Sequence, residues 1–455
     1  MKKIVLCLIT VIVLTVSFFT IKSQEKFVEV SVKEEPKQTT TKELMQTEET
    51  TKKQEKYHQV RIIISNNNYT SIYHSKIEMR AESMQVYYGK QYGSKKSVKS
   101  LTVDTDSKYF KNSSIIKVEA KTAICWENYG ISNEEKIYEG IFYIYKTKNG
   151  LVAVNQLDLE DYVAAVISSE MGETFPLEAL KAQAVCARTY IMNSKPQEYS
   201  AYDANGDDST AFQVYNRILP GEKCKKAAKE TRNKIMTYKG KLIKACYFST
   251  SCGYTTNYKI WGRKKLKYLN GCCVSETGFD IDSEADFGNF IKSKPKAYES
   301  KELYYRWNVF VTREQITNSV YRVTGVNIGK VNKIEINSRG VGGIASQITV
   351  YGDQSQIVMT NQNQIRKALN SYYSEVKLND GSVRTKMEML PSAFIYVENA
   401  YDNGKLCGFN IYGGGFGHGS GMSQNGAKAM AMAEKKMKYK EILKFFYSDI
   451  KIADI

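Results

Sequence analysis

The sequence predicts an α+β protein, in which a β-rich N-terminal module precedes a mixed α/β domain with a central cleft, and a transmembrane helix lies at the N-terminus. Three observations predict this fold. An apolar run follows Met1-Lys2-Lys3, short strand-like segments continue to residue 150, and apolar residues at helical spacing begin after Asp158. The 455 residues are 42% hydrophobic and 25% charged, which excludes a wholly disordered or collagen-like chain.

The N-terminal residues predict a membrane anchor and a tether. Residues 1–3 are expected to form a cytoplasmic stub and residues 4–22 an uncleaved anchor, because positive charge precedes the apolar run and no small-x-small cleavage pattern follows it. A cleaved signal peptide is the alternative. Residues 23–57 consist mostly of Glu, Lys, Thr and Gln, and this composition predicts a disordered tether. The folded part is therefore expected outside the cytoplasm.

The chain is basic, with 65 Lys and Arg against 48 Asp and Glu and a net charge of +17. Such a charge attracts polyanions before any specific site is considered. Because the folded part is expected outside the membrane, an anionic wall polymer is favoured as the partner and nucleic acid is not expected. A Lys-rich chain from an AT-rich genome would show the same excess without any binding role.

Residues 58–150 are expected to form the β-rich module, and residues 151–455 the mixed domain. Strands are predicted at 59–64, 84–88, 114–118 and 137–145, and later at 238–248, 335–351 with a turn at 341–344, and 408–412. Helices are predicted after the N-cap Asp158, after Thr174-Phe-Pro176, and over 426–437.

Glu170 and Arg188 are the candidate charged residues of the two predicted helices. Arg188 interrupts, and Glu170 ends, a row of apolar residues along one face of its helix. Glu170 should therefore lose hydration and have a raised pKa. If the two helices pack by these lines, both side chains enter one cleft and the guanidinium can fix the carboxylate or an anionic group of a ligand. The alternatives are a helix-end Glu turned to solvent and an Arg whose stem covers apolar surface.

Two polar segments supply further candidates. The run from Tyr412 to Gly426 holds seven glycines around His418 but lacks the spacing of a nucleotide loop, which favours a bend where backbone approaches a ligand closely. Ser423 and Gln424 beside it carry groups of the kind that bind sugars. Ser249, Thr250 and Ser251 follow a predicted strand, where they form either a binding site or a plain turn.

Nine cysteines are present, eight of them beyond the apolar run. Disulfides and buried free thiols both remain open, because the spacing is irregular and several cysteines lie in apolar context. Cys246 and Cys252 come nearest to a metal-ligand pair, but their spacing is wider than usual for zinc.

Several ordered motifs resemble the stage II sporulation protein D family. They are Leu159-Glu-Asp-Tyr-Val-Ala-Ala-Val, Ser169-Glu-Met-Gly, the segment from Glu178 to Tyr190 with its Ala-Arg-Thr-Tyr ending, Asp208 through Gln213-Val-Tyr215, Tyr247-Phe-Ser-Thr-Ser-Cys-Gly253, and Gly417-His-Gly-Ser-Gly-Met-Ser-Gln-Asn-Gly-Ala427. The resemblance covers residues 151–455, whereas residues 58–150 match only in being a preceding β segment.

The resemblance implies a membrane-anchored peptidoglycan lytic transglycosylase that acts on peptide-stripped glycan strands during engulfment in sporulation. The implied catalytic residues are Glu170 and Arg188, and the implied substrate-binding residues are Gln183, Ser249, Thr250, Ser251, His418, Ser423 and Gln424. The implied partners are a sporulation amidase and a membrane scaffold protein, at the septal or forespore-facing membrane.

Two points depart from that pattern or compete with it. Some relatives bind zinc through His-x5-Cys-x5-Cys, and Cys246 and Cys252 reproduce the cysteines while Gly240 replaces the His. No cofactor is therefore expected to be required, and zinc stays a minor possibility.

The same motifs resemble amidase enhancers, which bind wall and stimulate an amidase without cleaving glycan, so this is the alternative function. A structural protein of the spore envelope is a third hypothesis.

Overall fold

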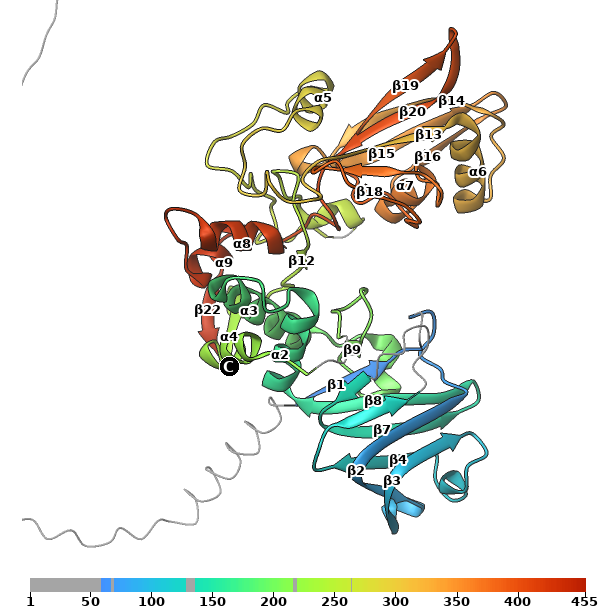
Figure 1. Ribbon diagram of the computed structural model, residues 1–455, viewed down its shortest axis with the longest axis vertical. Coiled ribbons are helices and arrows are strands. Elements are labelled where there is room, and N and C mark those ends of the chain that lie inside the picture. The colour runs from blue at the N-terminus through green and yellow to red at the C-terminus, as the bar shows by residue number, and fades with distance from the viewer. Residues whose placement is uncertain (1–58, 67–68, 128–135, 216–218, 263) are drawn as a thin grey trace, which may run out of the picture. The chain divides into compact units, whose positions relative to one another are not determined.

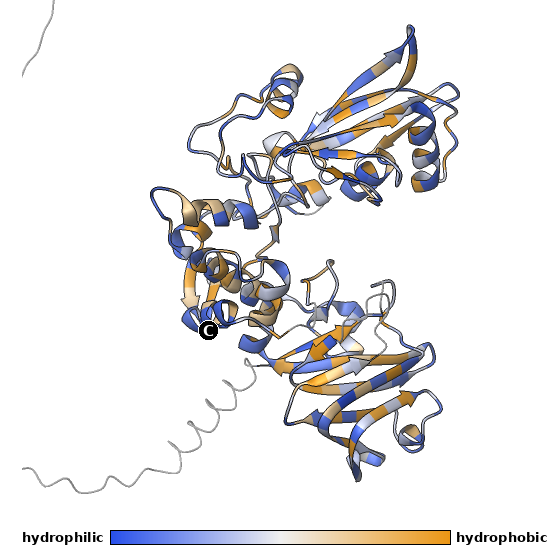
Figure 2. Cartoon of the chain, in the orientation of Figure 1, coloured by the Kyte–Doolittle hydropathy of each residue, from blue (hydrophilic) through white to orange (hydrophobic). Residues whose placement is uncertain are grey.

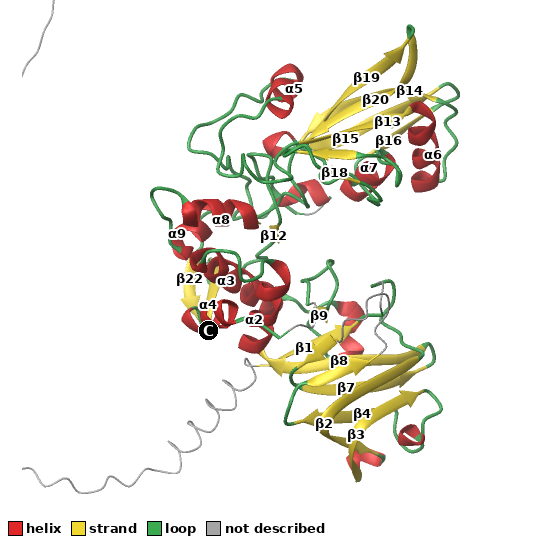
Figure 3. Ribbon diagram, viewed as in Figure 1, coloured by secondary structure: helices red, strands yellow, loops and turns green. Residues whose placement is uncertain are grey.

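The computed structural model describes residues 59–66, 69–127, 136–215, 219–262 and 264–455. The predicted stub, anchor and tether at 1–57 lie outside these residues. Among the described residues, no helix combines the length and the apolar character that crossing a bilayer requires. Figure 3 shows that helices and strands are both abundant, which confirms the α+β class.

The N-terminal module is one antiparallel-rich sheet. Its strands follow the order β6-β5-β2-β4-β7-β8-β1-β9, and β3 pairs with β2 (Figure 1). The bounds are β1 Gln59–Ile64, β2 Lys76–Tyr88, β3 Ser94–Asp104, β4 Ile115–Ala120, β5 Ile124–Glu127, β6 Lys136–Tyr138, β7 Ile141–Thr147, β8 Gly150–Asp158 and β9 Gly206–Asp207. Alternate residues of β4 and β7 are buried, and Figure 2 shows hydrophobic and hydrophilic residues interspersed along the strands of this sheet.

The sheet extends past the predicted boundary at residue 150. β8 pairs with both β7 and β1, and β9, which follows the first two helices in the chain, is added in parallel to β1. Ile62 of the sheet belongs to the same hydrophobic core as Leu180 and Tyr447. The predicted module is therefore packed on the first helices rather than separated from them by a linker.

Three helices follow the sheet and pack against one another. They are α2 Leu159–Glu170, α3 Leu177–Asn193 and α4 Glu222–Glu230. Asp158 caps α2 by accepting a hydrogen bond from the Glu160 N–H, as the sequence predicts. Pro176 is the N-cap of α3, one position before the first turn in which it was expected.

The predicted strand at 238–248 is broken into short pieces. β10 Lys234–Tyr238 and β11 Lys241–Leu242 form a hairpin that β22 Lys451–Asp454 extends, and β12 Tyr247–Phe248 pairs in parallel with β21 Met422–Ser423. The hairpin turns at Lys239 and Gly240, whose φ angles of 51° and 76° are left-handed. The C-terminal helices are α8 Gln424–Met432, which ends before the predicted residue 437, and α9 Tyr439–Phe446.

The segment between β12 and β21 has its own hydrophobic core, formed by residues from Trp307 to Ile411. Its strands follow the orders β18-β17-β13-β20-β19 and β14-β15-β16. The bounds are α5 Glu284–Lys292, β13 Trp307–Thr312, α6 Arg313–Thr324, β14 Val331–Arg339, β15 Ala345–Gly352, β16 Gln356–Met359, α7 Gln362–Ala368, β17 Val376–Leu378, β18 Val383–Arg384, β19 Ile395–Asp402 and β20 Lys405–Gly413. The turn predicted at 341–344 separates β14 from β15.

Candidate functional site

Glu170 is the last residue of α2, and the helix ends there because Gly172 adopts a φ of 75°. Three donors meet its carboxylate. The Val214 N–H and the Tyr247 hydroxyl donate to Oε1 over 2.9 and 3.1 Å, and the Gln424 amide donates to Oε2 over 3.2 Å. Burial raises the pKa of Glu170, and this effect outweighs the three hydrogen bonds that lower it. The prediction of a desolvated carboxyl with a raised pKa is confirmed.

The donors come from segments far apart in the sequence. Tyr247 and Gln424 are brought together by the parallel pair of β12 and β21, in which Tyr247 lies opposite Met422 and Phe248 opposite Ser423. Gln424 then begins α8, whose N-cap is Ser423. The end of the glycine-rich run therefore reaches Glu170, and Gln424 is the residue of the run that contacts the carboxylate.

Tyr247 and Gln213 belong to the site but were not predicted as site residues, although both stand inside the quoted motifs. The Tyr247 hydroxyl lies 3.1 Å from Glu170 Oε1 and 3.1 Å from Gln213 Oε1. The Gln213 amide nitrogen donates to the Tyr162 hydroxyl, which fixes the amide so that its oxygen faces Tyr247. One hydroxyl proton thus has two acceptors, only one of which is titratable.

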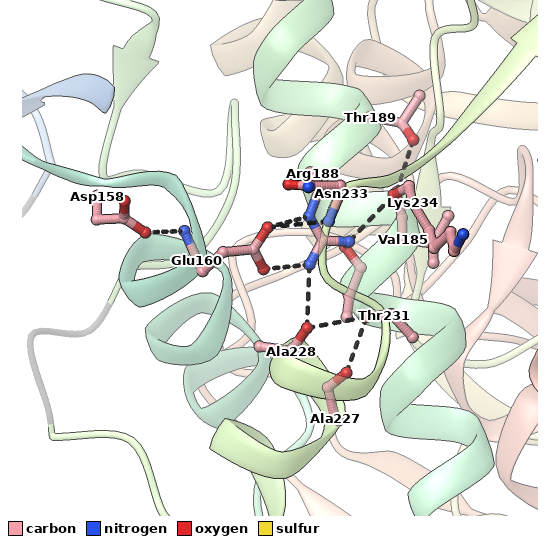
Figure 4. A network of polar contacts seen from close by, with 11 residues as sticks. Asp158, Glu160, Val185, Arg188, Thr189, Ala227, Ala228, Thr231, Asn233 and Lys234 are labelled. Atoms are coloured by element: carbon pink, nitrogen blue, oxygen red, sulfur yellow. Dashed lines mark hydrogen bonds and ion pairs between the residues drawn. The ribbon is translucent and has the colours of Figure 1, made fainter. Parts of the chain in front are cut away.

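Arg188 does not enter this site, so the prediction of a shared cleft is wrong. Its side chain is fully buried and forms two bonds with Glu160, from Nε to Oε1 over 2.9 Å and from Nη2 to Oε2 over 2.5 Å (Figure 4). Its remaining bonds go to backbone carbonyls, including those of Ala228 and Lys234. Glu160 lies about 15 Å from Glu170 along the axis of α2, at a rise of about 1.5 Å per residue. Arg188 therefore joins α2, α3 and the α4–β10 turn.

Gln183 is fully buried in α3, and its amide nitrogen and oxygen have no hydrogen-bond partner among the described residues. A buried amide without partners is costly, so a group that satisfies it would be stabilising. None of the donors to Glu170 comes from Gln183. Its predicted role in substrate binding stays a prediction.

The serine and threonine cluster after β12 is largely buried, and only Ser249 is half-buried. Thr250, Ser251 and Ser423 are buried, and Ser251 and Ser423 both donate to the carboxylate of Glu299. The Ser251 N–H adds a third bond over 2.9 Å. Ser249 bonds to Thr250, whose hydroxyl also accepts from the Asn425 amide. The hydroxyls of Ser251 and Ser423 are thus engaged by Glu299, and the predicted role of these residues in substrate binding stays a prediction.

Glu299 is a buried carboxylate that the sequence analysis missed, because the loop after α5 carries no motif around it. Burial raises its pKa to about 7 in spite of the bonds from Ser251 and Ser423. The residue fastens the Ser249–Ser251 loop to the N-terminus of α8. The ion pair of Lys428 with Glu302 over 2.9 Å adds a second link to the same helix.

Replacing Glu299 with Gln should change how stability depends on pH. The folded pKa of about 7 lies above the ordinary value of 4.5, so the stability that this group contributes is complete below pH 4.5 and lost as the pH rises through 7. The free energy of unfolding of the natural chain should therefore fall, relative to the Glu299→Gln variant, by up to about 3 kcal/mol between pH 4.5 and 7.5. Urea unfolding at both pH values measures this. The same change at the exposed Glu388 is the matched control. A difference between the natural chain and Glu299→Gln that does not change with pH would contradict the assignment.

His418 is half-buried between the rings of Phe248 and Trp261, at centroid distances of 5.6 and 6.0 Å. Gly417 and Gly419 on either side have φ angles of 111° and 78°, which allow the Ser420 N–H to donate to Nδ1 over 3.1 Å. Burial lowers the pKa of His418 to about 4, so the imidazole is neutral at physiological pH. It can offer a neutral hydrogen-bonding group and no cation.

The eight described cysteines are all free. Cys246 packs in the core that contains α3 and α9, whereas Cys252 belongs to a separate cluster with Phe287 and Phe290. Among the described residues, no group of three or more His, Cys, Asp or Glu side chains is arranged to hold a metal ion. Zinc binding by Cys246 and Cys252 gains no further ligand from the fold and stays a prediction.

Comparisons with known proteins agree with these motifs. A family model described as stage II sporulation protein matches residues 147–238, and a domain of unknown function matches 255–378 and 372–421. An uncharacterized protein of Brachyspira hyodysenteriae is 29% identical over 320 residues, covering 70% of this chain and 72% of its own length. The stage II sporulation protein D of Bacillus amyloliquefaciens is 28% identical over 327 residues, covering 68% and 78%. An amidase enhancer of Bacillus subtilis is 28% identical over 311 residues, covering 62% of this chain and 39% of the enhancer.

Proposed function

We propose, from the premise that the chain belongs to the stage II sporulation protein D family, that it is a peptidoglycan lytic transglycosylase acting on peptide-stripped glycan strands in sporulation. The relatives named for sporulation support a role at the cell wall. The observation that carries the enzymatic proposal is the environment of Glu170, a carboxyl whose pKa is raised and which three donors hold in place.

A lone carboxyl suffices for this reaction because no outside water has to be activated. Glu170 in its acid form gives its proton to the glycosidic oxygen as the bond to the anomeric carbon breaks, leaving an oxocarbenium-like sugar. The Glu170 carboxylate then takes the proton of the C6 hydroxyl of the same sugar, whose oxygen attacks the anomeric carbon. The products are a 1,6-anhydro end and a free hydroxyl, and Glu170 is protonated again.

The Tyr247 hydroxyl has a hydrogen-bond acceptor whether Glu170 is ionised or protonated. When Glu170 is ionised, the Tyr247 hydroxyl can donate to it, and when Glu170 is protonated the hydroxyl can donate to Gln213 Oε1 instead. Neither state leaves the tyrosine proton without an acceptor. The carboxyl can therefore cycle between acid and base without a change in its position.

Tyr247→Phe should raise the pKa of Glu170 further, because the carboxylate loses one of its three donors. If cleavage requires the acid form of Glu170, the rate falls as pH rises through this pKa, so the variant should keep its activity to higher pH than the natural chain. A pH–rate profile of anhydro-product formation measures the shift. Tyr321→Phe, at an exposed position of α6, is the matched control. Superimposable profiles for all three proteins would contradict the role of Tyr247.

The second candidate function is that of a non-enzymatic amidase enhancer. The similarity to a protein of that name favours it, together with the net charge of +17, which suits docking on an anionic wall. In this case the site around Glu170 would bind glycan and a partner amidase would do the cleavage. An amidase and a membrane scaffold protein are the proposed partners, and the proposed location is the outer face of a sporulation membrane, held by the N-terminal anchor.

Two parallel incubations distinguish the two functions. In the first, the purified chain is mixed with peptide-stripped glycan, and in the second a wall amidase acts on intact peptidoglycan with and without the chain; products of both are identified by mass spectrometry. Anhydro-disaccharides from the chain alone support the transglycosylase. Faster release of peptide by the amidase when the chain is present, with no anhydro sugar in either incubation, supports the enhancer and rejects the enzymatic proposal.

A further inference from the structure

A cavity of about 260 Å³ lies in the part of the chain that matches the domain of unknown function. Its walls come from the end of α5, the start of β13, the β17–β18 hairpin and Tyr412 of β20. The strands β17, β13 and β20 are neighbours in one sheet, which places these segments side by side. No residue that lines the cavity hydrogen-bonds to Glu170, so this is a separate site.

The described residues that line the cavity include four cations, Lys292, Lys294, Arg306 and Lys377, and no acidic residue. Only Lys292 has a carboxylate partner, Glu398, which lies outside the lining at 2.8 Å.

Lys294, Arg306 and Lys377 form no ion pair with a carboxylate among the described residues. Lys294 donates to the Asn379 carbonyl over 2.7 Å, and Lys377 is exposed. Arg306 is buried, and its guanidinium donates to backbone carbonyls and a tyrosine hydroxyl. Because the Arg306 nitrogens are already bonded to protein oxygens, its charge acts on the cavity only through the field, and Lys294 and Lys377 are the cations that an anion could contact directly.

The remaining lining combines apolar and aromatic residues with the polar Asn308 and Asn379 and with Gly381. Ile291 and Leu378 contribute aliphatic carbons, and Tyr412 and Trp307 contribute ring atoms. Such walls suit the carbon face of a sugar ring, since binding pockets combine mostly apolar surface with a few placed polar groups. Two lining residues also bond to the loops near Glu170. Arg306 donates to the Cys252 carbonyl, and the Trp307 indole donates to the Gly415 carbonyl.

We propose that this cavity binds a saccharide unit that carries a carboxylate, as in the lactyl-bearing amino sugar of a glycan strand. The identity of this ligand rests on the proposed function, because removal of the peptide is what frees that carboxylate. A phosphate polymer is disfavoured. Phosphate sites use a forked arginine or a nest of backbone N–H groups, and the nitrogens of Arg306 are already bonded to protein oxygens.

The test uses the three tryptophans of the full-length chain as reporters in NMR spectra of indole-labelled protein. Trp307 lines the cavity, Trp261 lies beside His418, and Trp126 is buried in the N-terminal sheet. The probes are N-acetylmuramic acid, N-acetylglucosamine, which lacks the lactyl carboxylate, and glycerol phosphate. We expect N-acetylmuramic acid to shift the Trp307 signal and to bind about ten-fold more tightly than N-acetylglucosamine, the effect of one charge-assisted contact.

Matched variants locate the contact. Lys377→Gln should weaken the binding of N-acetylmuramic acid several-fold and leave N-acetylglucosamine unaffected, whereas Lys405→Gln at the exposed start of β20 should change neither. Equal affinity for the two sugars, a shift of Trp261 without Trp307, tighter binding of glycerol phosphate, or no effect of Lys377→Gln would each overturn the proposal.

The binding measurement is independent of cleavage. Glu170→Gln should bind N-acetylmuramic acid in the cavity as the natural chain does. A Trp307 response in the natural chain, if that chain forms no anhydro product, would keep this site and reject the transglycosylase, and cleavage by the natural chain without a Trp307 response would do the reverse.

Discussion

Glu170→Gln is expected to lower the rate of anhydro-product formation by about 10²- to 10⁴-fold, because an amide can neither give a proton to the leaving oxygen nor take one from the C6 hydroxyl. The amide oxygen can still accept from Val214 and Tyr247, so two of the three contacts that position residue 170 are kept, and only the bond from the Gln424 amide is lost. Product release from peptide-stripped glycan, followed by mass spectrometry, measures the loss. Glycan binding in a pull-down should be unchanged.

The control for this variant is Glu222→Gln, at the start of α4. The Glu222 side chain is 89% exposed and pairs only with the neighbouring Lys225, so its loss should leave the cleavage rate unchanged. Undiminished cleavage by Glu170→Gln would end the proposed mechanism. A matching loss in both variants would point to impaired folding or solubility instead of chemistry, and circular dichroism of the two proteins would show it.

Arg188→Met is expected to lower the free energy of unfolding by about 3–5 kcal/mol, because it leaves the Glu160 carboxylate buried without its partner. Methionine keeps much of the side-chain volume, so the lost charge pair dominates the effect. Urea unfolding measures the change. The double variant Glu160→Gln/Arg188→Met should recover much of the stability, since replacing a whole buried pair costs little compared with breaking it.

Measuring both stability and glycan cleavage for these variants distinguishes a structural role of Arg188 from a catalytic one. Arg232→Met, at an exposed position in the α4–β10 turn, should have little effect and serves as the control. Loss of glycan cleavage with unchanged stability in Arg188→Met would return this residue to the chemistry and contradict the structural role. Recovery of cleavage together with stability in the double variant would support the structural role, because the substituted residues then carry no charge at all.

The order of elements was predictable because it depends on local patterns. Asp158 begins a helix with its side chain bonded to the Glu160 N–H, and Glu170 ends it before a glycine with left-handed φ, both of which are visible as residue types at a spacing. The raised pKa of Glu170 was predictable for the same reason, since an acid at the end of an apolar stripe loses water. The strand at 59–64 was also placed correctly.

The partners of polar residues were not predictable in this way. Arg188 and Glu170 lie on adjacent helices, yet the guanidinium pairs with Glu160 more than two turns earlier in α2. Ser251 and Ser423 have the composition of a sugar site but bond to Glu299, which lies in a loop without a motif. The spacing of apolar residues predicts which face of a helix is buried, but not how far the helix is shifted along its axis relative to its neighbour. It therefore could not predict whether Arg188 would pair with Glu160 or with Glu170.

The sequence by itself determined the α+β class and the starts of the first two helices, and it predicted Glu170 as a desolvated acid against the alternative of a helix-end Glu turned to solvent, because each follows from residues close together in the chain. Only the tertiary structure decided that Tyr247, Val214 and Gln424 hold that acid, that Arg188 is the buried partner of Glu160, and that four cations between residues 292 and 377 line one cavity. These outcomes depend on strand pairing and helix packing over distances of tens to hundreds of residues, where charge satisfaction and burial select the partner.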